Sequence, residues 1–138
     1  MNKELEELKA KWIIEEKEFN EKNLGRYVKR LIPLCKITRS SEVVLTDRGQ
    51  VLSLKDKVKL ALVARLIAHR LDASIPEEIS ANEISEFFLV DKLQVNARLK
   101  EVTDERFAIR ERKGVYKVNI GRIEKFFEEI EKKHGSGK

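Results

Sequence analysis

The spacing of apolar residues in the first third of the chain predicts two helices. Residues 2–22 carry Leu, Trp and Phe at near-helical spacing, with Glu and Lys at most of the positions between them, which is typical of an amphipathic helix. Residues 25–32 repeat the pattern over a shorter distance. Pro33 is expected to end this second helix, because proline disfavours helical backbone in the residue before it.

After Pro33 the apolar residues stand next to one another, as they do in strands. Residues 34–38 and 43–46 are rich in side chains that favour β-structure, and the turn-like residues 39–42 separate them. This arrangement predicts a β-hairpin. A further turn is expected at residues 47–50, where Asp and Gly occur together.

The next helix, from Ser53 to about Leu71, is apolar on almost every side. Ser53 followed by Asp56 is typical of a helix N-terminus, and Arg65 is the only charged residue between positions 60 and 68. A helix of this kind is normally covered on several sides. We therefore expect the N-terminal segment, or a second subunit, to pack against it.

Two helix starts then follow at short distance. Residues 80–83 (SANE) and 91–94 (DKLQ) both have the form of a capping box, in which the first side chain bonds the backbone of the fourth residue and the fourth bonds back. The first opens a short helix that ends before the turn at Leu89 and Val90. The second opens a helix to about Asp104. Two capped helices so close together favour a helix-turn-helix. The positions expected to be buried on the second helix are Val95, Leu99 and Val102.

A second hairpin and a last helix complete the pattern. Residues 106–110 and 115–120 are β-prone and flank the charged turn 111–114, where Gly114 tolerates positive φ. From Arg122 to about 133, apolar residues on one face predict an amphipathic helix.

The chain is thus expected to have an α+β fold, mostly α. Residues 1–52 form an N-terminal extension of helix, short helix and β-hairpin, and residues 53–120 form the central domain. Residues 121–134 form a C-terminal helix, and residues 135–138 a disordered tail.

Three stretches of the central domain resemble a known family. Residues 81–88 (ANEISEFF), 95–102 (VNARLKEV) and 112–118 (RKGVYKV) resemble archaeal winged helix-turn-helix domains. In these domains a short helix containing EIS precedes a recognition helix of the type VxARLxEL, and the wing ends in GxYxV. The resemblance covers residues 53–120, and residues 1–52 resemble no family. It implies the fold, which serves DNA, RNA and protein partners in different proteins.

The resemblance implies a small transcription regulator that binds duplex DNA, with the 92–104 helix in the major groove and the 111–114 wing beside it. Steps of 100° per residue turn Ala97 and Lys100 outward. Side chains of this kind can read adenine and thymine edges or bind phosphates. The expected DNA contacts are Lys92, Gln94, Asn96, Ala97, Lys100, Arg110, Arg112, Lys113 and Lys117.

Two other functions stay open. Glu101 and Asp104 lie on or near the outward side of the 92–104 helix, where DNA-binding members of the family often lack acids. They favour a protein-protein interaction adaptor in a larger assembly. The basic stretch 25–40, which holds five Lys and Arg and no acid, favours RNA or ribosome binding.

Association into a homodimer is expected through helix 2–22 or helix 122–133. Each carries an apolar stripe, and such a stripe needs a surface to cover it. A two-fold dimer would bind a palindromic site with half-sites about one helical turn apart.

Composition and the ends of the pattern predict the cellular compartment of the protein and argue against catalysis. Charged residues reach 38%, as in heat-adapted organisms, although a helix-rich protein can have the same composition. The acidic N-terminus, the single Cys35 and the lack of a long apolar run predict a cytoplasmic protein without a membrane span. With one Cys and two His, and no phosphate-binding or nucleophile motif, we expect no metal, no cofactor and no enzymatic activity.

Overall fold

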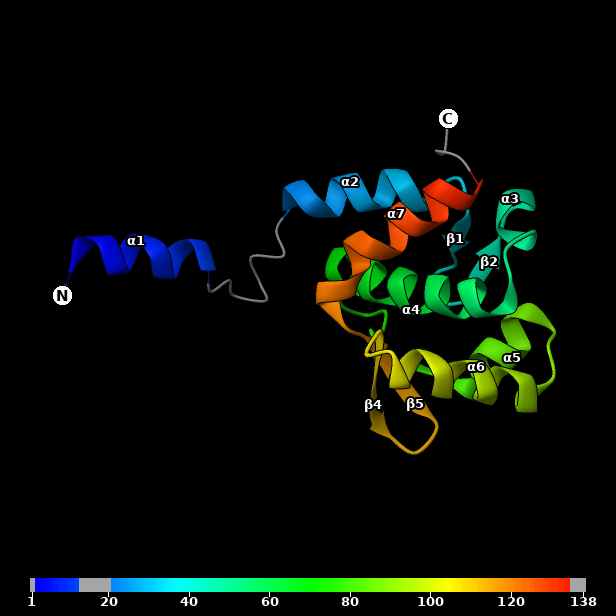
Figure 1. The fold of residues 1–138 in the computed structure, drawn as a ribbon. Coiled ribbons are helices and arrows are strands. Elements are labelled where there is room, and N and C mark those ends of the chain that lie inside the picture. The colour runs from blue at the N-terminus through cyan, green and yellow to red at the C-terminus, as the bar shows by residue number, and fades with distance from the viewer. Residues whose placement is uncertain (1, 13–20, 135–138) are drawn as a thin grey trace.

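The structure is a computed structural model that describes residues 2–12 and 21–134 (Figure 1). The chain has an α+β fold, mostly helical, as the sequence predicts. The helices are α1 (Lys3–Trp12), α2 (Glu21–Leu31), α3 (Asp47–Gln50), α4 (Leu54–Leu71), α5 (Ala81–Phe88), α6 (Lys92–Asp104), the 3-10 helix η2 (Ile120–Arg122) and α7 (Ile123–His134). The strands are β1 (Cys35–Ile37), β2 (Val43–Leu45), β3 (Ile79–Ser80), β4 (Ala108–Arg112) and β5 (Val115–Val118).

Helix α4 lies at the centre of the core. Its first turn is capped by Ser53, whose hydroxyl accepts a hydrogen bond from the backbone N–H of Asp56 (3.1 Å). Every residue from Leu60 to Ala68 is buried. Helix α2, the β1–β2 hairpin, α6, α7 and β5 all pack against it. The expectation that the N-terminal segment covers this helix is confirmed.

A three-stranded antiparallel sheet follows α4 along the chain. Its strands have the order β3-β5-β4. The short strand β3, which comes before α5, therefore pairs with β5, the second strand of the C-terminal hairpin. Helices α5 and α6 lie between β3 and β4 in the sequence and pack against each other. Gly114 closes the hairpin with φ of 75°, a conformation that glycine adopts without steric cost.

The N-terminal helices differ in their limits from the prediction. Helix α1 ends at Trp12 and α2 begins at Glu21, four residues before the expected start. The part of the predicted 2–22 helix at residues 13–20 lies outside the described residues, as does the predicted tail at 135–138. The turn expected at residues 47–50 is the short helix α3, because the Thr46 hydroxyl caps it by accepting from the backbone N–H of Gly49 (3.2 Å).

Helix α7 buries its apolar face within the same chain. Ile123, Phe126, Phe127 and Ile130 are all buried, and Tyr27 of α2 stacks on Phe127 with ring centroids 5.4 Å apart. The stripe that suggested a dimer through residues 122–133 is therefore already covered. Of the two stripes on which the dimer prediction was based, the one on α1 is still uncovered, with Leu5, Leu8 and Trp12 exposed.

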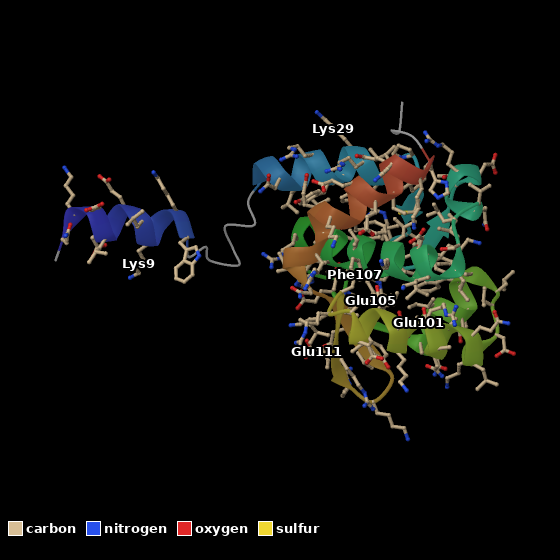
Figure 2. All side chains as sticks on the ribbon, in the orientation of Figure 1. Lys9, Lys29, Glu101, Glu105, Phe107 and Glu111 are labelled. Carbon is tan, nitrogen blue, oxygen red and sulfur yellow. The ribbon has the colours of Figure 1, made fainter. Side chains whose placement is uncertain are left out.

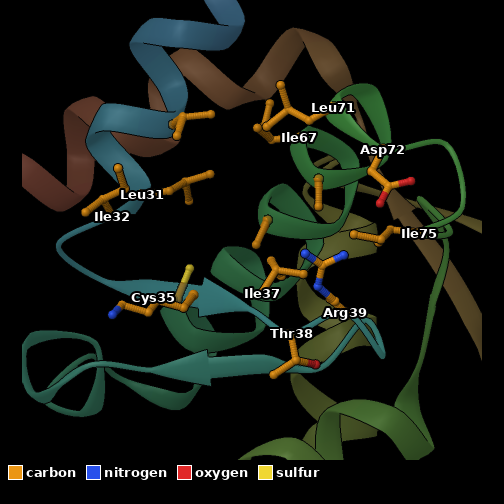
Figure 3. Close-up of a pocket in the computed structure, with 14 residues that line it drawn as sticks. Leu31, Ile32, Cys35, Ile37, Thr38, Arg39, Ile67, Leu71, Asp72 and Ile75 are labelled. Carbon is orange, nitrogen blue, oxygen red and sulfur yellow. The ribbon is translucent and has the colours of Figure 1, made fainter.

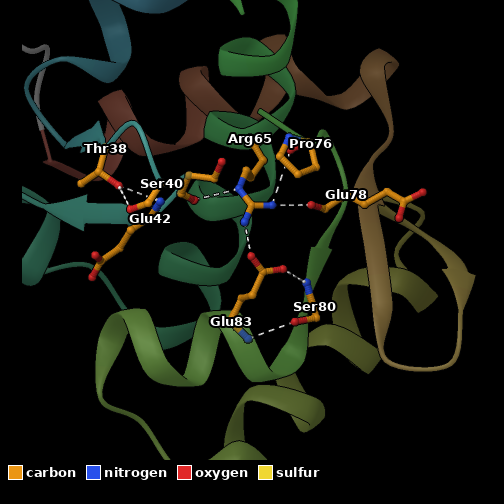
Figure 4. Close-up of polar contacts among 9 residues, drawn as sticks. Thr38, Ser40, Glu42, Arg65, Pro76, Glu78, Ser80 and Glu83 are labelled. Carbon is orange, nitrogen blue, oxygen red and sulfur yellow. Dashed lines mark hydrogen bonds and ion pairs between the residues drawn. The ribbon is translucent and has the colours of Figure 1, made fainter. Parts of the chain in front are cut away.

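Arg65 is the most deeply buried charged residue of the described core and joins three segments (Figure 4). Its side chain is 1% exposed. Nε donates to the carbonyl of Ser41 (3.0 Å) in the β1–β2 turn, and the guanidinium also donates to the carbonyls of Pro76 and Glu78. The same group pairs with the carboxylate of Glu83 in α5. One side chain thus holds together the β1–β2 turn, the segment before β3, and α5.

Glu83 has a second role as part of a capping box. Its carboxylate accepts from the backbone N–H of Ser80 (3.0 Å), and the Ser80 hydroxyl accepts from the N–H of Glu83 (3.0 Å). The start of α5 and the Arg65 ion pair therefore depend on the same carboxylate.

Replacing Arg65 with Met should lower the free energy of unfolding by about 3 kcal/mol or more, because removing one partner of a buried pair leaves polar groups without compensation. Urea denaturation measures this loss. The control is Lys57→Met on the same helix, at a partly exposed position, which should change stability much less. Equal losses in the two variants would contradict the role given to Arg65.

A second ion pair predicts a pH-dependent stability. Arg30 of α2 holds Glu131 of α7 through two hydrogen bonds (2.7 and 2.8 Å), and this bonding lowers the pKa of the Glu131 carboxyl. Because the folded pKa lies below the unfolded one, the stabilisation is complete above the usual carboxyl pKa and is lost as pH falls through the folded value.

Glu131→Gln should therefore cost about 1 kcal/mol at neutral pH and nothing in acid, where the wild-type carboxyl is itself neutral. Denaturation curves at both pH values measure this difference. Glu128→Gln, at an exposed position of the same helix, should have little effect at either pH. A loss from Glu131→Gln that stays the same in acid would contradict the assignment.

Candidate nucleic-acid interface

Helix α6 presents one whole side to solvent. Its start is fixed by Asp91, whose carboxylate accepts from the backbone N–H of Leu93 (2.7 Å). This is an N-cap, and the reciprocal bond from Gln94 that would complete the predicted capping box is not present among the described hydrogen bonds. Val95, Leu99 and Val102 are fully buried, as predicted. The opposite side is accordingly free of cover within the described residues.

The turn between α5 and α6 has a strained residue. Leu89 lies in the left-handed region with φ of 54°, a conformation that costs a non-glycine residue roughly 1–2 kcal/mol. Two hydrogen bonds hold the turn, from the Val90 N–H to the Ser85 carbonyl (3.1 Å) and from the Ser85 hydroxyl to the Val90 carbonyl (2.5 Å). The Leu89 side chain is 92% exposed.

The β4–β5 hairpin directs alternate side chains to two faces. Arg110 lies opposite Tyr116 in the register, and Ile109 lies opposite Lys117. Because successive residues of a strand point to opposite sides, Arg110 and Tyr116 share one face of the hairpin, and Ile109 and Lys117 share the other.

The Arg110 face of the hairpin and the start of α6 border a common hollow of about 470 Å³. Its lining includes three cationic side chains and no carboxylate. Four predicted contact residues are brought together here, namely Lys92, Asn96, Arg110 and Lys113. Three more, Gln94, Ala97 and Lys100, lie exposed along α6.

Two predicted contacts lie elsewhere. Lys117 is on the other face of the hairpin, where its ammonium pairs with Glu111 (2.8 Å). Arg112 pairs with Glu78 (2.9 Å), the residue before β3, although its side chain stays 65% exposed. Both cations have an acidic partner within the chain, so they contribute less positive charge to this surface than their number suggests.

The sequence prediction missed several residues of this surface. Leu93 is 78% exposed, on the outward side between Ala97 and Lys100, and the same 100° steps place it there. It was overlooked because a leucine in a helix is usually assigned to the core. Asn82 and Tyr116 also line the hollow. Their positions depend on how α5 and β5 pack together, which no local pattern reveals.

The acids of α6 are partly compensated. Glu101 pairs with Arg98 (2.9 Å) on the same helix and with Lys55 of α4 (3.9 Å). Lys55 also pairs with Glu105, and this hydrogen bond lowers the pKa of the Glu105 carboxyl. These acids gather toward the C-terminal end of α6, as Figure 2 shows for Glu101 and Glu105. Residues 92–100 hold three cations and no acid.

Two of the five cations in the basic stretch 25–40 are engaged by α7. Arg26 pairs with Glu124 (3.5 Å), and Arg30 pairs with Glu131 and stacks over the Phe127 ring at 4.7 Å. This part of the surface therefore offers an RNA fewer cations than the sequence suggests.

The remaining candidates for reactive or metal-binding groups include the Cys35 thiol and the His69 imidazole. Burial raises the pKa of the Cys35 thiol to about 12, which keeps it protonated and unreactive. Nδ1 of His69 lies 2.7 Å from the carbonyl oxygen of Ile75. Among the described residues, no group of three or more His, Cys, Asp or Glu could hold a metal ion, and no helix has the length and apolar character to cross a bilayer.

Comparison with known proteins gives no relative: no family model, no curated protein and no solved structure matches this chain.

Proposed function

We propose that residues 53–120 form a winged helix-turn-helix domain and that the protein is a transcription regulator that binds duplex DNA. Two features support the fold: the order helix, strand, two helices and hairpin, and the strand order β3-β5-β4. The observation that carries the function is the shared hollow between α6 and the hairpin, which is lined by three cations and no acid. A polyanion is the ligand that such a surface favours.

In this proposal the first half of α6 enters the major groove. Lys92, Arg110 and Lys113 bind phosphates on either side of it, which gives affinity without sequence information. Asn96, together with Gln94, offers paired donor and acceptor groups to adenine. The acids near the C-terminal end of α6 stay outside the groove. The negative charge of Glu101 is already compensated by its ion pairs with Lys55 and Arg98.

The proposal also assigns base recognition to the exposed apolar side chains of α6. Leu93 and Ala97 are one helical turn apart and both exposed. An apolar side chain at such a position contacts the 5-methyl group of thymine. The small Ala97 allows the helix to approach the base edges closely.

Replacing Lys92 and Lys113 together with Ala should weaken duplex binding and make it less sensitive to salt. Each phosphate contact contributes roughly 0.9 to the slope of log affinity against log salt concentration, so the slope should fall by about two. Titration of a labelled duplex at several salt concentrations measures both quantities.

The control replaces two other lysines, Lys29 and Lys132, with Ala. Both are exposed, and Lys29 lies on α2 at the end of the molecule opposite the β4–β5 hairpin (Figure 2). This variant has the same net charge as the test variant and should keep the wild-type slope. If both variants lose affinity equally, the binding reflects net charge and the proposed surface is wrong.

A second prediction tests the thymine contact. A duplex is first selected from a pool with a randomised centre and then remade with deoxyuridine for thymidine, which removes only the methyl groups. Wild-type affinity should fall about four-fold for each contacted methyl, from about 0.8 kcal/mol per buried carbon. The Leu93→Ser variant should show a smaller difference between the two duplexes.

Equal wild-type affinity for the thymine and uracil duplexes would exclude methyl recognition by α6. Binding through phosphates would still stand in that case, so the two parts of the proposal fail separately.

One observation favours a second function, an adaptor that binds another protein. Leu89 and Leu93 are both exposed and four residues apart, and Leu89 keeps a large apolar side chain where its backbone favours glycine. Exposed apolar side chains gathered in this way often mark protein contacts. Absence of duplex binding by the wild-type protein at low salt would make this function the better supported one.

A further inference from the structure

An apolar groove lies on the side of the core formed by the N-terminal extension and α4 (Figure 3). The last turn of α2, strand β1 and the C-terminal half of α4 border it, and its volume is about 570 Å³. Ile32, directly after α2, and Leu71, the last residue of α4, line it and remain mostly exposed, with Leu71 at 63%. Two large aliphatic side chains at one groove leave apolar surface in water, which favours an occupant.

Helix α1 has an apolar stripe that matches this groove in character. Leu5, Leu8 and Trp12 are spaced so that they lie along one side of the helix, and all three are exposed, Trp12 by 86%. A tryptophan left in water keeps a large apolar surface uncovered. The described part of the chain therefore holds an uncovered apolar helix face and an uncovered apolar groove.

The length of the chain between them allows the two to meet. Residues 13–20 join Trp12 to Glu21, and nine peptide links span up to about 30 Å, whereas α2, with 11 residues, is about 16 Å long. The chain can therefore turn back along α2 and bring α1 to the groove beside Ile32.

Charge favours one orientation of α1. Its first half carries Glu4, Glu6 and Glu7 against the single cation Lys3, and its last turn holds Lys9 and Lys11. If α1 runs antiparallel to α2, its acidic half lies near the end of α2. Lys36 and Arg39 line the groove and are exposed, and Asp72 is the acid in its lining.

We propose that the groove is the docking site of the chain's own helix α1, which binds antiparallel to α2 with Leu5, Leu8 and Trp12 facing the apolar lining. Docking in this way covers the exposed side chains of Ile32 and Leu71. This inference is independent of the proposed DNA binding, because α6 and the β4–β5 hairpin do not line the groove.

Trp12 is the only tryptophan of the chain, so its fluorescence reports docking in the full-length protein directly. We expect its emission maximum at shorter wavelength than that of N-acetyltryptophanamide, with acrylamide quenching reduced several-fold. Leu71→Glu places a charge on the groove and should return both properties to the values of the free compound. The change is at an exposed position, and circular dichroism checks that the fold is retained.

The control is Val51→Glu, at an exposed apolar position outside the groove, which should leave Trp12 fluorescence unchanged. Three results would overturn the proposal. The first is wild-type emission equal to that of the free compound, and the second is an equal response to both variants. The third is a blue shift that grows with protein concentration, which would assign the α1 stripe to a second copy.

Discussion

The buried guanidinium of Arg65 is the interaction on which the arrangement of the central domain depends. A guanidinium has donors in a fixed planar fork, and once buried it has to find acceptors in matching positions. Here the acceptors come from the β1–β2 turn, the segment before β3 and Glu83 of α5. These three segments can satisfy the charge only when all of them are in place, so their packing is a joint requirement of one side chain.

The candidate interface takes its geometry from that requirement. Glu83 fixes the start of α5, and the strained turn at Leu89 sets the direction in which α6 leaves it. Strand β3 follows the segment that Arg65 holds and pairs with β5, so the hairpin is anchored to the same support. The two walls of the hollow are thus connected through the core. Of the cations that line it, Lys92 sits on α6 and Arg110 on β4, and Lys113 lies in the tight turn of the hairpin. Support of this kind suits the phosphate binding that we propose for this surface.

Local patterns were enough to predict the elements but not the partners of the charged side chains. Ser53, the Ser80–Glu83 capping box and Gly114 act through neighbours within a few residues, so their roles follow from sequence alone. By contrast, Arg112 meets Glu78 and Arg30 meets Glu131 across long stretches of chain. These pairs arise only when distant segments pack together, and they change which cations a ligand can reach. Leu93 was missed for another reason, since its residue type suggested the core while its position on the helix indicated solvent.

The position of α7 has a consequence for the order of folding. The aromatic face of this last helix packs beside α2, which comes early in the chain, and next to α4 at the centre of the core. A ribosome releases the N-terminal part first, so the apolar surface that α7 covers has no cover from this helix until residues 123–134 have been synthesised. The hydrophobic core therefore closes only after α7 has been synthesised, and a polypeptide truncated before Phe126 exposes an apolar surface that quality-control proteases and chaperones can bind.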